Sequence, residues 1–155
     1  MKILVVSDSH GNRKALMRAV SATGPDMVLH LGDIASDCGI IRENMPELPV
    51  RAVRGNCDGF ANEAAEDEFT AGGRRIFMAH GDRYGVKTGL NSFITSAMYR
   101  NADIALFGHT HRNFSMEYEG MLILNPGSVG TEQKTYAVLE IRDGAVKYDI
   151  CDLML

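Results

Sequence analysis

One arrangement recurs along this chain: a short apolar run ends in a glycine-containing loop that carries histidine, aspartate or asparagine. In chain order, these loops are Asp8-Ser9-His10-Gly11, Gly32-Asp33, Gly55-Asn56, His80-Gly81 and Gly108-His109-Thr110-His111. A short apolar run that is bounded by turn residues is typical of a buried strand. Because the loops after parallel strands meet at one edge of an open α/β sheet, we expect the polar residues of these loops to gather there.

The first third of the chain predicts alternating strands and helices. Residues 2–7 and 27–31 are apolar, and the segment between them carries apolar residues at helical spacing. The helical positions are Ala15, Leu16, Ala19 and Val20. A weaker helix is expected over 38–44, before a third strand over 50–53. Two strands that are joined by a helix over about thirty residues predict a parallel βαβ unit.

The rest of the chain predicts a hairpin, one helix and a set of mostly antiparallel strands. The hairpin covers 66–70 and 74–79, the helix 90–99, and the strands 104–107, 113–118, 121–124, 135–141 and 146–150. No internal repeat or linker divides the sequence, and 45% of its 155 residues are hydrophobic. A chain of this size and composition is expected to form one domain that spans 1–155.

The charge and the apolar pattern disfavour several classes of protein. The net charge is −4 and the basic residues are scattered, unlike those of a non-specific nucleic-acid binder. No apolar run approaches the ~18 residues that cross a membrane, and the first residues hold too few apolar side chains for a signal peptide. Cys38, Cys57 and Cys151 share no CxxC spacing, which fits reduced thiols. We therefore expect a cytoplasmic protein.

The histidines are concentrated in the loops that follow strands. Of the five histidines, four lie there, and Asp8, Asp33 and Asn56 share that position. These four are His10, His80, His109 and His111. A cluster of imidazole, carboxylate and amide groups is costly to desolvate unless a positive charge neutralises it. A pair of metal ions would supply that charge.

The mixture of ligand atoms narrows the choice of metal. Histidine nitrogens together with carboxylate and amide oxygens, and without a thiolate pair, suit Mn(II), Fe, Co, Ni or Zn better than Ca or Mg. Seven such groups exceed what one tetrahedral ion uses, but they fit two ions that share a bridging carboxylate. Two ions about 3.5–4 Å apart can hold a phosphate and activate a water molecule for in-line attack.

The five loops, in this order and at these distances, resemble the motifs of the calcineurin-like metallophosphoesterase superfamily. Ser-Asp-Ser-His-Gly, Gly-Asn-Cys-Asp, Gly-His-Thr-His and Asn-Pro-Gly-Ser are together similar to the small prokaryotic phosphodiesterase branch, over essentially the whole chain. The resemblance implies an α/β fold: a four-layer αββα sandwich of two mixed β-sheets flanked by helices, with the site at the strand ends. It also implies a hydrolase that acts on phosphate esters.

The resemblance assigns a role to each motif residue. Asp8, His10 and His111 would bind one ion, Asn56, His80 and His109 would bind the other, and Asp33 would bridge the two. The implied cofactors are two divalent transition-metal ions per chain, with Mn(II) as the first choice and Ni, Co, Fe or Zn as alternatives. The implied catalytic residues are Asp33, Asn56, Cys57 and His109.

Cys57 departs from the pattern of the wider superfamily, in which many members carry a histidine after the asparagine. The resemblance implies that this histidine protonates the leaving group or steadies the transition state. A thiol is a weak hydrogen-bond donor. We therefore expect activated aryl esters to be cleaved faster than alkyl esters.

Two further polar features lie beside these motifs. His30 is inside an apolar run and is expected to be a buried core histidine, with contact to a metal ligand as the second interpretation. The segment 125–128 is expected to be a turn that packs against the metal loops. Its Ser128 is also a candidate contact for a substrate phosphate.

The leading functional hypothesis is a phosphodiesterase that acts on a small phosphodiester. A phosphomonoesterase or phosphoprotein phosphatase uses the same metal pair and remains an alternative. The retromer scaffold subunit shares the implied fold, has lost ligands and works as a binding platform, which gives a non-enzymatic alternative. A nuclease is less favoured because no basic groove is evident. The strand over 146–150 and the tail Leu153-Met154-Leu155 are candidates for pairing chains into a homodimer or higher homo-oligomer.

Overall fold

Two β-sheets stack face to face in the computed structural model, which describes residues 1–59 and 61–153. The first sheet has the order β10-β9-β1-β2-β3 and the second has the order β4-β5-β6-β8-β7. The strands are β1 Lys2–Val6, β2 Met27–His30, β3 Val50–Ala52, β4 Glu66–Ala71, β5 Arg74–Ala79, β6 Ile104–Leu106, β7 Asn113–Tyr118, β8 Met121–Pro126, β9 Thr135–Arg142 and β10 Ala145–Asp152.

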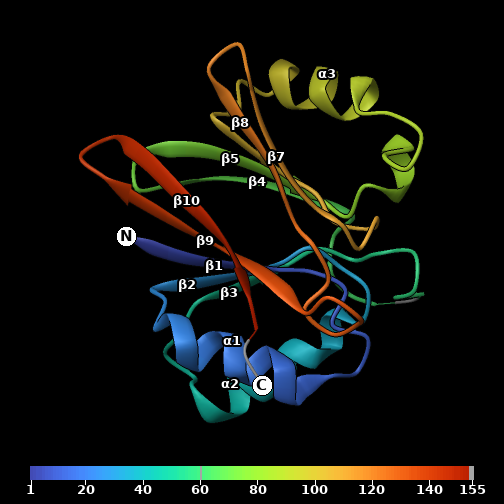
Figure 1. Ribbon diagram of the computed structural model, residues 1–155, viewed down its shortest axis with the longest axis vertical. Coiled ribbons are helices and arrows are strands. Elements are labelled where there is room, and N and C mark those ends of the chain that lie inside the picture. The colour runs from blue at the N-terminus through green and yellow to red at the C-terminus, as the bar shows by residue number, and fades with distance from the viewer. Residues whose placement is uncertain (60, 154–155) are drawn as a thin grey trace.

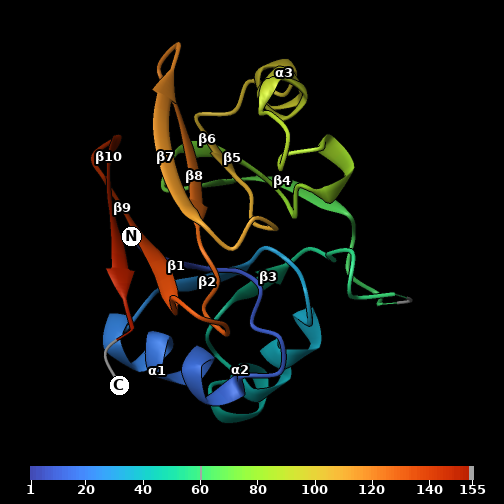
Figure 2. The same ribbon diagram turned by 45° about the vertical axis from the view of Figure 1, so that its right-hand side comes forward.

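The helices form the two outer layers. They are α1 Arg13–Thr23, α2 Gly39–Asn44 and α3 Asn91–Tyr99, with short 3-10 turns at Ala35–Cys38 and Asp82–Tyr84. Helices α1 and α2 cover the outer face of the first sheet, and α3 covers the outer face of the second (Figure 1, Figure 2). The expected four-layer αββα sandwich of two mixed sheets is confirmed.

Helix α1 shows why the first strands run parallel. Its buried residues are Ala15, Leu16, Ala19 and Val20, the four positions that the apolar spacing selects. The Asn12 side chain accepts a hydrogen bond from the Ala15 amide at the start of the helix, and Gly24 ends it in the left-handed conformation. Because α1 packs on the sheet and returns the chain to the end where β1 starts, β2 pairs with β1 in parallel.

The last third of the chain divides between the two sheets. Its strands pair in antiparallel hairpins, β7 with β8 and β9 with β10, as expected. Strand β8 also lies parallel to β6, and β9 crosses to the first sheet, where it pairs antiparallel with β1. Every residue of β8 is buried, which fits an interior strand that is covered on both faces.

The main core lies between the sheets. Ile3, Val5, Ile76, Leu106 and Leu139 are all inaccessible to solvent there. Burial of these side chains is the main favourable contribution to folding. Two smaller apolar clusters attach the helices to the outer faces.

One residue of the tail that is a candidate for pairing chains lies inside the protein. Leu153 is 8% exposed and packs into the cluster beneath α1, while Met154 and Leu155 lie outside the described residues. Strand β10 is an edge strand, so its outer side is available for pairing. Within 1–59 and 61–153, no helix has the length and apolarity to span a membrane.

Candidate metal centre

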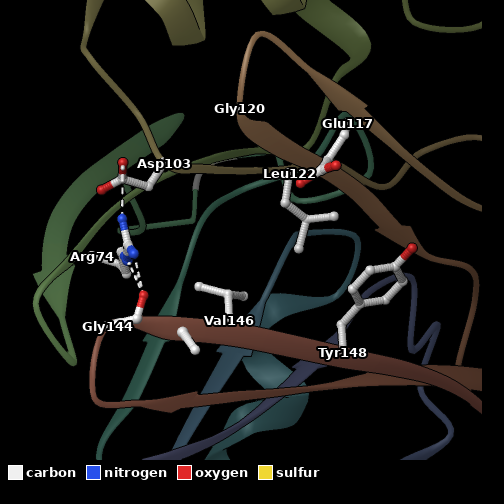
Figure 3. A pocket seen from close by; sticks show the side chains of 9 residues that line it. Arg74, Asp103, Glu117, Gly120, Leu122, Gly144, Val146 and Tyr148 are labelled. Atoms are coloured by element: carbon white, nitrogen blue, oxygen red, sulfur yellow. Dashed lines mark hydrogen bonds and ion pairs between the residues drawn. The ribbon is translucent and has the colours of Figure 1, made fainter.

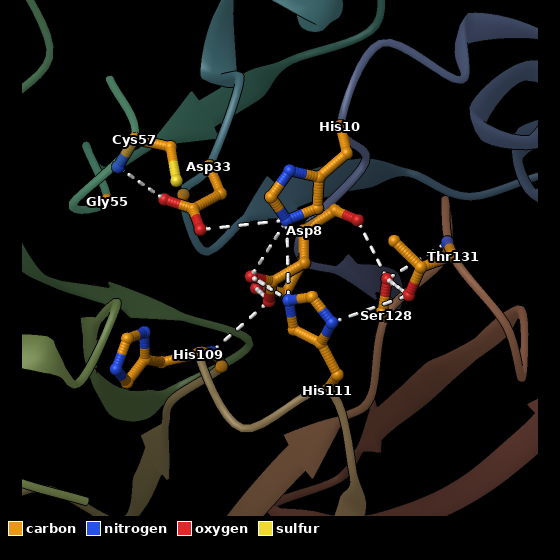
Figure 4. A network of polar contacts seen from close by, with 12 residues as sticks. Asp8, His10, Asp33, Gly55, Cys57, His109, His111, Ser128 and Thr131 are labelled. Atoms are coloured by element: carbon orange, nitrogen blue, oxygen red, sulfur yellow. Dashed lines mark hydrogen bonds and ion pairs between the residues drawn. The ribbon is translucent and has the colours of Figure 1, made fainter. Parts of the chain in front are cut away.

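The loops after the parallel strands bring Asp8, His10, Asp33 and His111 together. Each residue offers one ligand atom, and these four atoms lie within 4.8 Å of one another. The His111 Nε2 atom is 3.2 Å from Asp8 Oδ1, and it is 3.3 Å from His10 Nε2. Figure 4 shows both imidazoles turned toward the two carboxylates. Asp8 and His10 come from the loop after β1, whereas His111 comes from the second sheet, so the cluster joins the sheets.

A second pair of histidines lies on the other side of Asp33. The His80 Nε2 atom is 3.4 Å from Asp33 Oδ2 and 3.2 Å from His109 Nδ1. The same Asp33 oxygen is 3.7 Å from His10 Nε2. One carboxylate oxygen of Asp33 therefore stands between two histidine pairs, the position that a bridging ligand needs.

Asn56 and Cys57 lie at the exposed edge of this cluster. The Cys57 backbone amide donates a hydrogen bond to Asp33 Oδ1 at 2.9 Å, which fixes the other oxygen of that carboxylate. The Asn56 side-chain amide donates to Cys57 Sγ at 3.6 Å. Burial and the nearby Asp33 raise the pKa of the Cys57 thiol, so it stays protonated at neutral pH.

The donor set fits bound cations. Asp8 Oδ1 is buried and makes no hydrogen bond to any described residue, although the Nε2 atoms of three histidines lie 3.2 to 3.9 Å from it: His10, His80 and His111. A buried carboxylate oxygen without a hydrogen-bond donor is costly, and a metal ion would satisfy it. The imidazole and carboxylate ligands are those of transition-metal sites.

The electrostatics of the cluster also favour a cation. Burial acts to raise the pKa of Asp33, but hydrogen bonds from His80 and from the Cys57 amide hold that pKa well below its ordinary value. Burial acts to lower the pKa of His80, but Asp33 and Asp8 raise it above its ordinary value. The carboxylates thus attract positive charge at His80 Nε2, while His80 Nδ1 is occupied by the Leu31 carbonyl at 2.8 Å.

The backbone around these ligands is strained. Asp8, His10, Asp33, His109 and His111 all have positive φ, between 46° and 70°. Residues other than glycine adopt this left-handed region at a cost, and such residues gather at functional sites. Among the described residues, ten residues other than glycine have positive φ, and five of the ten are these candidate ligands.

Asp37 supports the loop after β1, which carries Asp8 and His10, and it was not singled out from the sequence. Its Oδ2 atom accepts hydrogen bonds from the Ser9 hydroxyl at 2.7 Å and from the Gly11 amide at 2.8 Å. Arg13 lies 3.3 Å from its other oxygen. Asp37 thereby anchors the residues on both sides of His10. It lies in the 3-10 turn, and no local pattern marks its role.

Asp58 supports the other side of the cluster. Its Oδ2 atom accepts from the amides of Asp33 at 2.9 Å and Gly55 at 2.6 Å, and its Oδ1 atom accepts from Ala35 at 3.0 Å. One side chain thus holds the Asp33 loop against the Asn56 loop. The signal was present in the sequence, because Asp58 ends the Gly-Asn-Cys-Asp motif.

Ser128 packs against the loop that carries Asp8, as expected for the segment 125–128. It is buried, and its hydroxyl donates to the Asp8 carbonyl oxygen at 2.8 Å. The hydroxyl of Thr131 donates to Ser128 and also lies 3.4 Å from His111 Nδ1 (Figure 4). Ser128 therefore supports the Asp8 loop through its side chain.

A pocket of about 500 Å³ lies at the opposite end of the sandwich from these residues, between the turns of the β7–β8 and β9–β10 hairpins (Figure 3). Arg74 and Asp103 face each other in it at 3.8 Å, and Leu122, Val146 and Tyr148 line its wall. It contains none of the motif residues.

Comparison with known proteins agrees with this geometry. A family model for the calcineurin-like phosphoesterase superfamily domain matches residues 1–144. A Bacillus subtilis protein named probable metallophosphoesterase YsnB is 32% identical over 152 residues, which cover 94% of this chain and 87% of that protein. The Methanocaldococcus jannaschii protein named phosphodiesterase MJ0936 is 27% identical, over 82% of this chain and 83% of that protein.

Solved structures show the same architecture. A crystal structure of a Streptococcus pneumoniae protein described as a predicted phosphoesterase aligns with a TM-score of 0.81 at 26% identity, covering 97% of this chain and 88% of that chain. Vps29 of Entamoeba histolytica, solved in complex with zinc, aligns with a TM-score of 0.75 at 23% identity, covering 99% and 100%. The second likeness is one of fold. Together with the match over residues 1–144, these findings show that the chain belongs to the calcineurin-like phosphoesterase superfamily.

Proposed function

We propose that this chain is a metal-dependent phosphodiesterase that hydrolyses a small phosphodiester at a dinuclear centre. The observation that carries the proposal is the position of Asp33, whose Oδ2 atom lies between the His10 and His80 imidazoles. The relatives named phosphodiesterase and probable metallophosphoesterase support the same chemistry.

In this proposal, the ligands divide as the motifs imply. Asp8, His10 and His111 hold one ion, Asn56, His80 and His109 hold the other, and Asp33 bridges them. Mn(II) is the first choice, with Ni, Co, Fe or Zn as alternatives. When bound, two such ions would neutralise the charge of the phosphate and lower the pKa of a water molecule.

The residues of the chain then orient the substrate and control protons. Burial, His80 and Lys87 lower the pKa of His109, which keeps its imidazole neutral and able to act as a ligand. The protonated thiol of Cys57 is the proposed, weak donor to the leaving group. This weakness supports preferential cleavage of diesters whose leaving group needs no proton, such as aryl esters.

We further propose a single domain over 1–155 and a cytoplasmic location. Cys38, Cys57 and Cys151 are free thiols, which suits a reducing compartment. The outer side of β10 is the proposed contact if two chains pair.

The test combines elemental analysis with hydrolysis of bis-p-nitrophenyl phosphate on the same sample. We expect about two transition-metal ions per chain and activity that EDTA abolishes. Asp33→Asn and His109→Ala should each lose at least ~100-fold in kcat/KM, whereas Asp149→Asn, an exposed carboxylate on β10, should match wild type. Full activity of both site variants would refute the proposal. A faster rate on p-nitrophenyl phosphate than on the diester would instead identify a phosphomonoesterase.

A further inference from the structure

A second cavity, of about 440 Å³, opens beside the loop that carries His109 and His111. Thr110, which stands between these histidines in the chain, lines the cavity. The other walls come from the loop 86–90 and from the start of β7 at Phe114. The cavity therefore lies next to the candidate metal centre, separated from its histidines by one position in the chain.

Part of the cavity wall is formed by two phenylalanine rings that pack against each other and against the core. Phe114 is 39% exposed, and its ring centroid lies 6.3 Å from that of the buried Phe107. Phe107 is supported in turn by Phe93, whose ring centroid is 5.2 Å away. Val86 is buried at the same wall. The Phe114 ring thus presents an open surface on a packed support, an arrangement that suits a flat ligand.

The polar groups of the cavity favour an anion at its mouth. Lys87 and Arg112 line it and are exposed, and the described residues of its wall include no carboxylate. Thr88 and Asn113 offer hydrogen-bonding groups at the wall. A ligand with a ring at Phe114 and a phosphate at the metal loop matches this distribution.

We propose that this cavity binds a flat aromatic ester group of the substrate, which stacks on Phe114 while its phosphate lies at the metal centre. The inference rests on the proposed function and narrows its substrate class to phosphate esters that carry a ring. An alkyl ester group would leave the Phe114 ring in water. A nucleobase and a simple aryl group share the required chemistry, and the hydrogen-bonding groups beside the ring favour the nucleobase.

The test measures binding by calorimetry to the metal-loaded protein with two matched ligand pairs. Adenosine 5′-monophosphate and ribose 5-phosphate differ in the base alone, and phenylphosphonate and methylphosphonate differ in the ring. We expect the ligand with the ring to bind about tenfold more tightly in at least one pair. A preference in the first pair identifies a nucleobase site, and one confined to the second pair identifies an aryl site. Equal dissociation constants within both pairs would overturn the inference.

Two variants locate the preference. Phe114→Ala should reduce the ratio of dissociation constants to within about twofold and leave methylphosphonate binding unchanged. Tyr118→Ala is the matched control, because Tyr118 lies on the same strand, is 41% exposed and is outside the cavity. A preference that survives Phe114→Ala would refute the assignment to this cavity. If the wild-type protein does not hydrolyse bis-p-nitrophenyl phosphate, the proposed function is refuted instead. The failure of this inference and the failure of the proposed function are therefore distinguishable.

Discussion

The imidazole of His30 and the hydroxyl of Ser9 lie 2.8 Å apart in the interior of the protein. The Gly32 amide donates to His30 Nδ1 at 3.1 Å, so the neutral ring carries its proton on Nε2 and donates it to Ser9. Ser9 lies between Asp8 and His10, while Gly32 precedes Asp33. The buried histidine therefore connects the loops that carry Asp8 and Asp33. It is a buried core histidine, as the first interpretation from the sequence expects, and its hydrogen bonds go to chain neighbours of the candidate ligands.

Acid should destabilise the protein through His30. Burial lowers the pKa of His30 from 6.5 to about 4. As the pH falls below 6.5, the unfolded chain takes up a proton that the folded chain excludes until about pH 4, so the free energy of unfolding decreases across this window. The decrease is on the order of 3 kcal/mol. Urea unfolding in EDTA between about pH 4 and pH 7 measures it. His30→Gln should flatten this dependence, and an unchanged slope would contradict the assignment.

Asp58 should control metal affinity without contacting the metal. Asp58→Asn replaces one acceptor oxygen with a donor that faces a backbone amide, because three amides donate to this carboxylate. We expect a loss of roughly 1–3 kcal/mol in stability and of about 10–100-fold in metal affinity. Chelator competition measures the affinity. Asp143→Asn, at an exposed turn, should change neither quantity. Wild-type metal affinity in Asp58→Asn would show that the Asp33 loop keeps its conformation without the Asp58 carboxylate.

Gly55 should tolerate no side chain. A Cβ atom there would lie 2.2 Å from Asp33 Oδ1 and 2.6 Å from the Asp33 amide nitrogen. Gly55→Ala should therefore displace Asp33, with a cost of about 1–3 kcal/mol and at least a tenfold loss of metal affinity. Gly39→Ala is the matched control, because Gly39 has helical backbone angles and open space around it. Its stability should equal or exceed that of wild type by up to about 1 kcal/mol. Equal behaviour of the two variants in thermal and metal titrations would contradict this prediction.

The two histidine pairs should each control one ion. His111→Gln and His109→Gln should each lower the metal content from about two ions per chain to about one, because the other set of ligands remains. Elemental analysis of the variants, purified identically, measures the content. Loss of both ions in either variant would indicate one cooperative site, and loss of none would remove that histidine from the ligand set.

Much of the fold was predictable because the local signals agree with the final structure. The apolar spacing over 13–23 selects the same four residues that α1 buries, and the hairpin across Gly72-Gly73 forms as β4 and β5. The ligand loops were predictable for a different reason. Their glycines, carboxylates and histidines follow the strands directly, so sequence order alone places them at strand ends.

The rest depends on contacts between distant segments. Nothing in 135–142 indicates that this segment pairs with β1 while the neighbouring β8 pairs with β6. Asp37 reaches Ser9 across 28 positions, and a lone aspartate in a short turn carries no signal of that contact. Phe114 lies at the start of an amphipathic strand, and its place in the cavity became visible only once the loop 86–90 was positioned.

The pairing of β9 with β1 has a consequence during synthesis. Ile3 pairs with Leu139, so β1 is synthesised well over a hundred residues before its antiparallel neighbour β9 exists. Until then, one hydrogen-bonding edge of β1 is open, and His111 has yet to join Asp8. Such distant pairings slow folding and expose strand edges to other chains. The β1 edge is therefore protected only after β9 has been translated, although the finished sandwich keeps β1 in the middle of a sheet.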